Sequence, residues 1–322
     1  TPLLLTVPQL EQLMATAALF GVHPSHAFTS VETSPEYADR PRLNVLKKAG
    51  VSRVSIGIQS FQDEELKAIK RRPRQNTIYQ ALDDIRQMDF PYFNIDLIYG
   101  IKGQTVESFL YSLEEALRFQ PNELFIYPLY VRQGTGITER EPDDVCFRMY
   151  RAACKLLQAK GFLQTSMRRF IHHPSTDAEV SCGDEVMLSC GSGGRSYLGD
   201  LHYATRYTVC QQCIAREIDE YMATTDFTVA RNGFILSAKE QQQRFIIKNL
   251  MYYMGIDKAE YTRRFGEPLD RTPLFRQLAE QYWIEETPER IRLTPEGLGY
   301  SDYIGQLFIT PEIRQLMETY SY

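Results

Sequence analysis

The chain has 322 residues and a mass of 37.3 kDa, enough for one large domain and a smaller one. Its net charge of −5 gives no electrostatic reason to expect a nucleic-acid partner, and no apolar stretch reaches the roughly 18 residues of a membrane span. Six cysteines, mostly far apart, are not typical of a secreted disulfide scaffold, so we expect a cytoplasmic protein without a membrane partner.

The first half of the sequence alternates predicted helices and strands. Apolar spacing predicts helices over 7–20, 63–70, 76–90, 106–117 and 143–160, with Thr105 as the N-cap of the helix over 106–117. A further helix is predicted to end at Gly50. Strands are predicted over 27–33, 53–60, 93–100 and 123–131. Strand followed by helix, repeated along the chain, predicts a parallel sheet, so we expect an α/β partial (β/α) barrel at 1–162.

The pattern changes after residue 162. We expect a connecting region with short strands and loops at 163–236. A helix over 237–254, two helices around Gly266, a two-stranded wing and a final helix predict a small helical, winged-helix-like domain at 237–322. Its slight excess of acidic residues argues against DNA binding and favours a packing or lid role.

Strand parity predicts a polar site. Apolar residues take one side of 53–60 and of 93–100, which leaves Gln59 and Asp96 on the other side, and Glu32 lies opposite Val31. All three would point inward near the carboxyl ends of their strands, where parallel barrels place ligands. The alternative is that these groups satisfy one another or bind water in the barrel interior.

Five ordered motifs carry a family resemblance: VETSP at 31–35, RVSIGIQSF at 53–61, NIDLIYG at 94–100, GQT at 103–105 and YPLYV at 127–131. GSGGRSYLG at 191–199 and RIRLTPEGLGYSD at 290–302 extend it over nearly the whole chain. Together they resemble the oxygen-independent coproporphyrinogen III oxidase (HemN/HemW-like) branch of the radical S-adenosylmethionine (SAM) superfamily. The wording VETSPE and QTSMRRF is typical of a bacterial subfamily beside the characterised coproporphyrinogen enzymes.

The resemblance implies a SAM site on the open end of the barrel. Glu32 matches the acidic residue that contacts the polar part of SAM, while Gln59 and Asp96 match residues near its ribose. Arg71 matches an arginine that pairs with the SAM carboxylate, although KRRP at 70–73 departs from the usual Gly-Arg-x-His. The backbone around Tyr99, Gly100 and Ile101, and around 127–129, would lie near the adenine.

The resemblance also implies a [4Fe–4S] cluster held by a Cys-x3-Cys-x2-Cys run, which this sequence does not contain. The chain opens with Thr1-Pro2, which resembles the end of a family loop that follows those cysteines. We therefore expect an N-terminally truncated chain that lacks the first βα unit and the cluster ligands. Such a chain would not cleave SAM by itself.

Several residues outside the barrel are further candidates. Cys210 and Cys213 form the only CxxC and, with Cys182 and Cys190, can build an auxiliary metal site; alternatively the pair only lies one turn apart on a helix. The arginines Arg168, Arg169 and Arg195 can pair with substrate propionates. His172, His173 and His202 can contact a tetrapyrrole or ligate heme, or lie in plain core and surface positions.

The resemblance implies a radical SAM oxidoreductase that resembles coproporphyrinogen III oxidase. In such enzymes an electron from a reductant such as flavodoxin or ferredoxin drives cleavage of SAM to methionine and a 5′-deoxyadenosyl radical, which takes a hydrogen atom from the substrate. The alternatives are a HemW-like heme-binding or delivery protein and a radical enzyme with a non-tetrapyrrole substrate. A barrel hydrolase would need a nucleophile or a metal site that the sequence does not offer.

Overall fold

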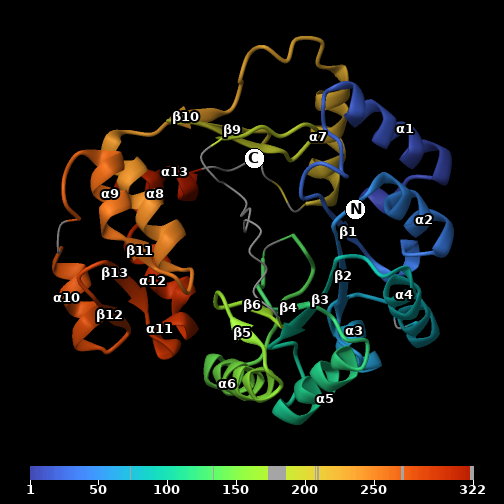
Figure 1. The fold of residues 1–322 in the computed structure, drawn as a ribbon, viewed down its shortest axis with the longest axis horizontal. Helices are drawn as coiled ribbons and strands as arrows, with labels where there is room; N and C mark the ends of the chain where they lie inside the picture. Colours follow the sequence, from blue (N-terminus) through green and yellow to red (C-terminus); the bar gives the residue numbers. More distant parts are fainter. Residues whose placement is uncertain are drawn as a thin grey trace. The chain divides into compact units, whose positions relative to one another are not determined.

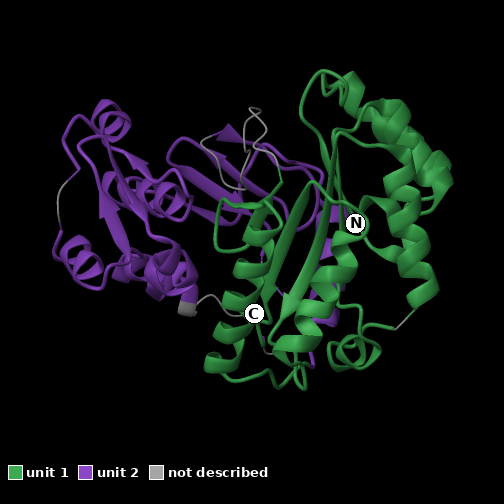
Figure 2. Ribbon diagram, turned by 60° about the horizontal axis from the view of Figure 1, so that its bottom comes forward, with its two compact units in different colours: residues 1–131, 137–174 green, residues 132–136, 175–322 purple. Residues whose placement is uncertain are grey.

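The computed structural model describes residues 1–72, 74–132, 134–172, 186–206, 208, 210–269 and 272–319. The chain forms two compact units, shown in different colours in Figure 2. Unit 1 comprises residues 1–131 and 137–174, and unit 2 comprises residues 132–136 and 175–322. The three-part division at 162 and 236 that the sequence led us to expect stays a prediction.

Unit 1 is an α/β unit built around one six-stranded sheet (Figure 1). Its elements are η1 (Pro2–Leu4), α1 (Val7–Leu19), β1 (Ser30–Thr33), η2 (Pro35–Tyr37), α2 (Arg40–Ala49), β2 (Arg53–Gln59), α3 (Asp63–Ala68), α4 (Gln75–Met88), β3 (Tyr92–Tyr99), α5 (Val106–Leu117), β4 (Glu123–Pro128), α6 (Asp143–Ala159), β5 (Leu163–Gln164) and β6 (Arg169–Ile171). The strand order is β1-β2-β3-β4-β6-β5. Neighbours among β1 to β4 run parallel, whereas β6 runs antiparallel to β4 and β5.

Local signals in the sequence explain where these elements begin and end. The Asp39 side chain accepts a hydrogen bond from the Arg42 amide and starts α2, and Gly50 ends that helix at a φ of 83°. Thr105 caps α5 by accepting from the Ser108 amide, as its position predicted. The fully buried side chains of Ile56 and Ile95 pack with those of the helices in one core, which leaves the other face of each strand for polar residues.

Unit 2 contains two small antiparallel sheets and most of the later helices. Its elements are β7 (Val186–Met187), β8 (Arg195–Leu198), β9 (Leu201–Ala204), α7 (Gln211–Ala223), β10 (Gly233–Ile235), α8 (Ala238–Leu250), β11 (Ile256–Asp257), α9 (Lys258–Phe265), α10 (Pro273–Glu280), β12 (Ile284–Glu286), β13 (Arg290–Leu293), α11 (Pro295–Gly299), α12 (Ser301–Leu307) and α13 (Pro311–Thr319). The sheet orders are β10-β9-β8-β7 and β11-β13-β12. A second apolar core joins α8 to α12 with β11 to β13.

Two features of the structure differ from the pattern expected from sequence. The region 163–236, expected to hold short strands and loops, also contains the 13-residue helix α7. The wing of the C-terminal domain gains a third strand, because β11 pairs with β13 through Ile256 and Asp257. Within the described residues, no helix has the length and apolar character needed to cross a membrane.

Candidate functional site

The strand register brings the predicted inward residues to one face of the unit 1 sheet. Glu32 of β1 pairs with Ser55 of β2, and Ser55 pairs with Asn94 of β3. One layer further toward the carboxyl edge, Gly57 pairs with Asp96. Since residues two apart on a strand share a face, Glu32 and Asp96 lie on the same face, in adjacent layers.

Gln59 reaches this face through an irregular backbone. It has a φ of 73°, and the register between β2 and β3 shifts between Gly57 and Gln59. A Cβ atom at Gly57 would lie 2.5 Å from Nε2 of Gln59, so the Gln59 amide lies over the glycine. Because Gly57 pairs with Asp96, the amide is held beside the strand that carries the carboxylate.

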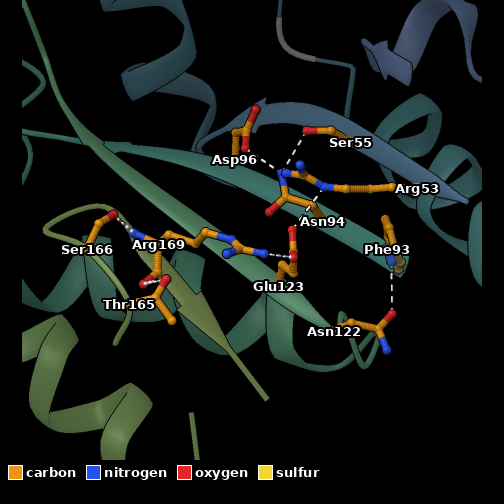
Figure 3. A network of polar contacts seen from close by, with 10 residues as sticks. All are labelled: Arg53, Ser55, Phe93, Asn94, Asp96, Asn122, Glu123, Thr165, Ser166 and Arg169. Carbon is orange, nitrogen blue, oxygen red and sulfur yellow. Dashed lines mark hydrogen bonds and ion pairs between the residues drawn. The ribbon is translucent and has the colours of Figure 1, made fainter. Parts of the chain in front are cut away.

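Asp96 is the most perturbed acid of the face. The Asn94 amide donates hydrogen bonds of 2.7 Å both to Asp96 and to the Ser55 hydroxyl (Figure 3). Burial raises the pKa of Asp96 to about 6; the Asn94 hydrogen bond opposes this rise, the Glu32 charge adds to it and Arg53 again opposes it. The face can therefore change its charge near neutral pH.

Two further groups show that the face is polar and incompletely satisfied. The pKa of Tyr127 is raised by burial first and then by the charges of Asp96 and Glu32, so its hydroxyl stays neutral near them. Oδ1 of Asn94 is fully buried and has no hydrogen-bond partner within the described residues. A buried acceptor without a partner is costly, which is a reason to expect a donor from a bound molecule or water.

The amino ends of the strands hold an ion network. Nε of Arg53 lies 2.9 Å from Oε2 of Glu123 as an ion pair, although neither atom makes a well-directed hydrogen bond among the described residues, and the Arg169 guanidinium contacts the other carboxylate oxygen (Figure 3). The Glu123 side chain is only 4% exposed, and the arginines are 18% and 17% exposed. Arg169, a predicted substrate contact, thus already pairs with a buried carboxylate.

A second buried network clamps the carboxyl ends of β2 and β3 together. The Glu65 carboxyl group accepts from the Ser60 hydroxyl at 2.5 Å and from Nε2 of Gln104 at 2.9 Å. Oε1 of Gln104 accepts from the amides of Gly100 at 2.7 Å and Ile101 at 3.2 Å. Glu65 and Gln104 are 5% and 3% exposed, so this clamp is sealed from solvent.

The predicted Tyr99–Gly100 segment offers only its backbone to a ligand. The Tyr99 ring packs in the core against the rings of Phe109 and Tyr150. Gly100 has a φ of 82°, and a Cβ there would lie 2.6 Å from the Cys146 sulfur. The Tyr99 and Gly100 carbonyls accept from the Leu129 and Glu141 amides, so a ligand here would gain packing more than hydrogen bonds.

The other candidates of unit 1 come from segments outside β1, β2 and β3, although the charge of Arg168 acts on Tyr127. Arg71 is exposed in the segment after α3, with no side-chain bond to Glu32 or Asp96 among the described residues. The Arg168 guanidinium contacts the Tyr130 hydroxyl and lies 5.8 Å from the ring centre. The His172 ring packs edge-on against Phe162, and His173 lies outside the described residues.

In unit 2, His202 is part of the packing of the sheet. Its ring stacks on Tyr197 with centres 4.1 Å apart, and Nε2 is fully buried. Burial, followed by the charges of Arg195 and Arg244, lowers its pKa. The lowered pKa favours the neutral ring, and a role of His202 toward a tetrapyrrole stays a prediction.

The predicted auxiliary metal site is not assembled in the described part of the chain. No group of three or more His, Cys, Asp or Glu residues there is arranged to hold a metal ion. Cys190 is exposed, Cys210 and Cys213 are partly exposed, and Cys182 lies outside the described residues. The four cysteines therefore remain a prediction as a set.

Sequence reasoning missed four of the residues that shape the two networks and the sheet face: Arg53, Glu65, Gln104 and Glu123. Parity offered a signal for two of them, because Arg53 shares the parity of Ser55 and Glu123 precedes the buried Leu124. The segment 127–129 was expected near the adenine through its backbone, whereas the structure places the Tyr127 side chain near Asp96 and Glu32. No comparable signal marked Glu65 and Gln104, because these two hydrogen-bonded residues lie 39 positions apart in the chain.

Comparison with known proteins gives two family matches. Residues 1–116 match the radical SAM superfamily, and residues 236–299 match the HemN C-terminal domain. The heme chaperone HemW of Bacillus subtilis is 26% identical over 95% of this chain and 84% of its own length. The oxygen-independent coproporphyrinogen III oxidase of Thermostichus vulcanus is 25% identical over 83% of this chain and 89% of its own length.

The fold also matches a solved structure. Coproporphyrinogen III oxidase (HemN) from Escherichia coli superposes with a TM-score of 0.77 at 21% identity, over 95% of this chain and 75% of that one. The α/β fold predicted from the sequence is thereby confirmed. SAM and a [4Fe–4S] cluster are the cofactors of the superfamily that both sequence and fold indicate. The chain belongs to the radical SAM superfamily, in the group that includes the HemW heme chaperones and the oxygen-independent coproporphyrinogen III oxidases.

Proposed function

We propose that unit 1 binds SAM on the polar face of its sheet, at the carboxyl edge of β1, β2 and β3. The observation that carries this proposal is the convergence of Glu32, Gln59 and Asp96 on one face from three separate strands. Carboxylate and amide oxygens accept hydrogen bonds from hydroxyl and ammonium donors, and SAM carries both on its ribose and its aminoacyl group. Asn94 adds a buried acceptor that lacks a partner among the described residues.

Each residue has a distinct task in this proposal. Asp96, held by the Asn94 amide at 2.7 Å, accepts from the ribose hydroxyls in its ionised form. Glu32 is exposed and accepts from the ammonium group, while the Gln59 amide fixes the ligand between β2 and β3. The clamp of Glu65 and Gln104 keeps the ends of β2 and β3 at a constant separation.

The sequence fits SAM better than it fits the cluster. With both cofactors bound, the chemistry of the superfamily is reductive cleavage of SAM followed by removal of a hydrogen atom from a substrate. The six cysteines of this sequence include no Cys-x3-Cys-x2-Cys run, so its own residues do not supply the three thiolates. The part played by this chain is to bind and orient SAM.

For the reaction we propose a tetrapyrrole substrate and an oxidoreductase that resembles coproporphyrinogen III oxidase. The names of the relatives from Thermostichus vulcanus and Escherichia coli support this choice. Binding of heme without decarboxylation is the second candidate, and the HemW match over 95% of the chain favours it. The residues of the sheet face serve SAM in either case.

Titration calorimetry of this chain with SAM tests the first step. We expect Asp96→Ala and Glu32→Ala each to weaken binding by about ten-fold, or about 1.4 kcal/mol. Glu36→Ala, an exposed acid that follows β1, is the matched control and should bind as the unchanged protein does. Equal affinity for SAM in the unchanged protein and the three variants would contradict the proposed binding site.

Anaerobic assays test the second step. The protein should be produced with any residues that precede Thr1 in its gene, reconstituted with iron and sulfide, and given SAM and dithionite. Formation of 5′-deoxyadenosine together with carbon dioxide from coproporphyrinogen III would support the oxidase. Bound heme without decarboxylation would support the second candidate, and 5′-deoxyadenosine without either would indicate another substrate.

A further inference from the structure

The start of helix α7 carries two thiols in a Cys-x-x-Cys arrangement. Cys210 is the N-cap residue of this 13-residue helix, and Cys213 lies in its first turn. Both residues are free and partly exposed. Their side chains form a hydrogen bond with each other, and a small molecule can reach both.

The local contacts distinguish the two thiols. A hydrogen bond from the Cys213 thiol, followed by one from its backbone amide, lowers the pKa of Cys210. The same side-chain contact raises the pKa of Cys213. A thiolate at a helix N-terminus beside a second thiol is the arrangement in which a cysteine attacks a disulfide and its neighbour resolves the product.

A pocket of about 290 Å³ lies beside the first turns of α7, and its walls are formed by the neighbours of the two cysteines and not by the cysteines themselves. Thr208 and Ile214, which flank the two cysteines in sequence, line it, and the Thr208 hydroxyl accepts a hydrogen bond of 3.2 Å from the Cys210 amide. Thr208 thus connects the N-cap residue of α7, Cys210, to the wall of the pocket.

The other lining residues indicate the chemistry of an occupant. Arg195 and Arg206 bring guanidinium groups to the pocket, which suit a carboxylate. Glu217 is only 7% exposed, and its Oε1 is buried with no hydrogen-bond partner within the described residues. A ligand that carries both a carboxylate and an ammonium group would match this set, because the ammonium can donate to Glu217.

We propose that Cys210 and Cys213 are a redox-active dithiol that reacts with small disulfides carrying carboxylate and ammonium groups, which bind in the pocket of Arg195, Arg206 and Glu217. This dithiol and its pocket use other residues than the proposed SAM site and do not depend on it. Glutathione disulfide has the stated chemistry and serves as the probe.

The reaction balances as a thiol–disulfide exchange. The Cys210 thiolate attacks one sulfur of the small disulfide, which forms a mixed disulfide and releases one small thiolate. The Cys213 thiol then loses its proton to solvent and attacks the Cys210 sulfur, which releases the second small thiol. The protein dithiol is oxidised by two electrons to the Cys210–Cys213 disulfide, and the small disulfide is reduced to two thiols.

The test incubates the whole chain with glutathione disulfide, or with the uncharged bis(2-hydroxyethyl) disulfide, and follows the Cys210–Cys213 disulfide by peptide mass spectrometry. We expect glutathione disulfide to react about ten-fold faster at low ionic strength because the charged pocket concentrates it. Cys213→Ser should accumulate the mixed disulfide on Cys210, and Cys190→Ser should behave as the unchanged protein.

A second variant tests the pocket without removing a thiol. Arg206→Gln should abolish the rate advantage of glutathione disulfide, while Arg231→Gln, an exposed arginine outside the pocket, should keep it. Absence of the Cys210–Cys213 disulfide, equal rates with the two probes, or retention of one zinc ion per chain that Cys210→Ser abolishes would each overturn the proposal.

Discussion

The two ends of the polar face of the unit 1 sheet are built in opposite ways. At the amino ends of the strands, Glu123 lies between Arg53 and Arg169 and forms an ion pair with each of them. At the carboxyl edge, Glu32 and Asp96 share a face with no ion pair of their own among the described residues. The charges at the amino ends are paired with one another within the fold, whereas the carboxylates at the carboxyl edge can still bind a ligand.

The difference separates stability from binding on a single surface. A buried carboxylate with two guanidinium partners holds the strand ends together, and loss of its charge would remove the anion that both guanidinium groups share. A carboxylate whose pKa burial has raised stores unfavourable energy in the folded state, which a ligand donor can relieve. Substitutions at the two ends of the face should therefore affect stability and binding differently.

Glu123→Ala should have the largest effect on stability. Removal of this side chain leaves the half-buried Arg53 and Arg169 without their shared anion, and we expect a loss of about 3 kcal/mol in the free energy of unfolding, the lower end for a broken buried ion pair, because both guanidinium groups keep some access to water. Urea denaturation followed by circular dichroism measures it. Glu64→Ala, which removes an exposed pair with Lys67, should cost less than about 1 kcal/mol. Similar losses in the two variants would remove the distinction between the two kinds of ion pair.

Glu65→Ala should cost about 1–3 kcal/mol, because Ser60, Gln104 and Ser108 all lose their buried acceptor. It should also weaken SAM binding, since the ends of β2 and β3 are no longer tied. Thermal unfolding and calorimetric titration are the two measurements. Unchanged SAM affinity in a destabilised but folded variant would show that the clamp serves the fold alone.

Asp96→Asn should change how stability depends on pH. Folding raises the pKa of Asp96 from 3.8 to about 6. The contribution of this group to the free energy of unfolding is therefore fully present below about pH 4, where the acid is protonated in both states, and is lost as the pH rises through 6. The variant, which resembles the protonated acid, should match the unchanged protein at pH 4 and exceed its stability at pH 8 by at most about 3 kcal/mol. Unfolding curves of the two proteins at pH 4 and pH 8 measure this difference. Equal stability of the variant and the unchanged protein at pH 8 would contradict the raised pKa of Asp96.

Gly57→Ala should have a small effect on stability and a clear one on binding. The new Cβ would displace only the end of the flexible Gln59 side chain, so we expect less than about 1 kcal/mol of destabilisation. If the Gln59 amide contributes to SAM binding, Gly57→Ala and Gln59→Ala should weaken it to the same extent in calorimetry. A loss confined to Gln59→Ala would show that the amide finds another position.

The sequence predicted the sheet face well where the signal was periodic. Parity placed Glu32 and Asp96 on one side because each follows or precedes buried apolar neighbours on a short strand. Gln59 was assigned to the same side by alternation, but it reaches that side through a left-handed backbone and a register shift that alternation does not describe.

Other features depended on contacts between distant segments. Arg169 was read as a substrate contact because nothing local shows its pairing with Glu123, 46 residues earlier. Helix α7 was not predicted over its full length, since its first turn contains two cysteines and two glutamines, which give little apolar periodicity. The side chain of Tyr99 turned toward the core because it shares the parity of Ile95 and Leu97.

The position of Gln104 has a consequence for hydrogen exchange. A turn that follows a strand normally exchanges its amide hydrogens quickly with solvent, because they point to water. Here one buried side-chain oxygen accepts from two successive amides, those of Gly100 and Ile101. These two amides should therefore exchange as slowly as those of the sheet, and opening of this turn requires the unit 1 core to open with it.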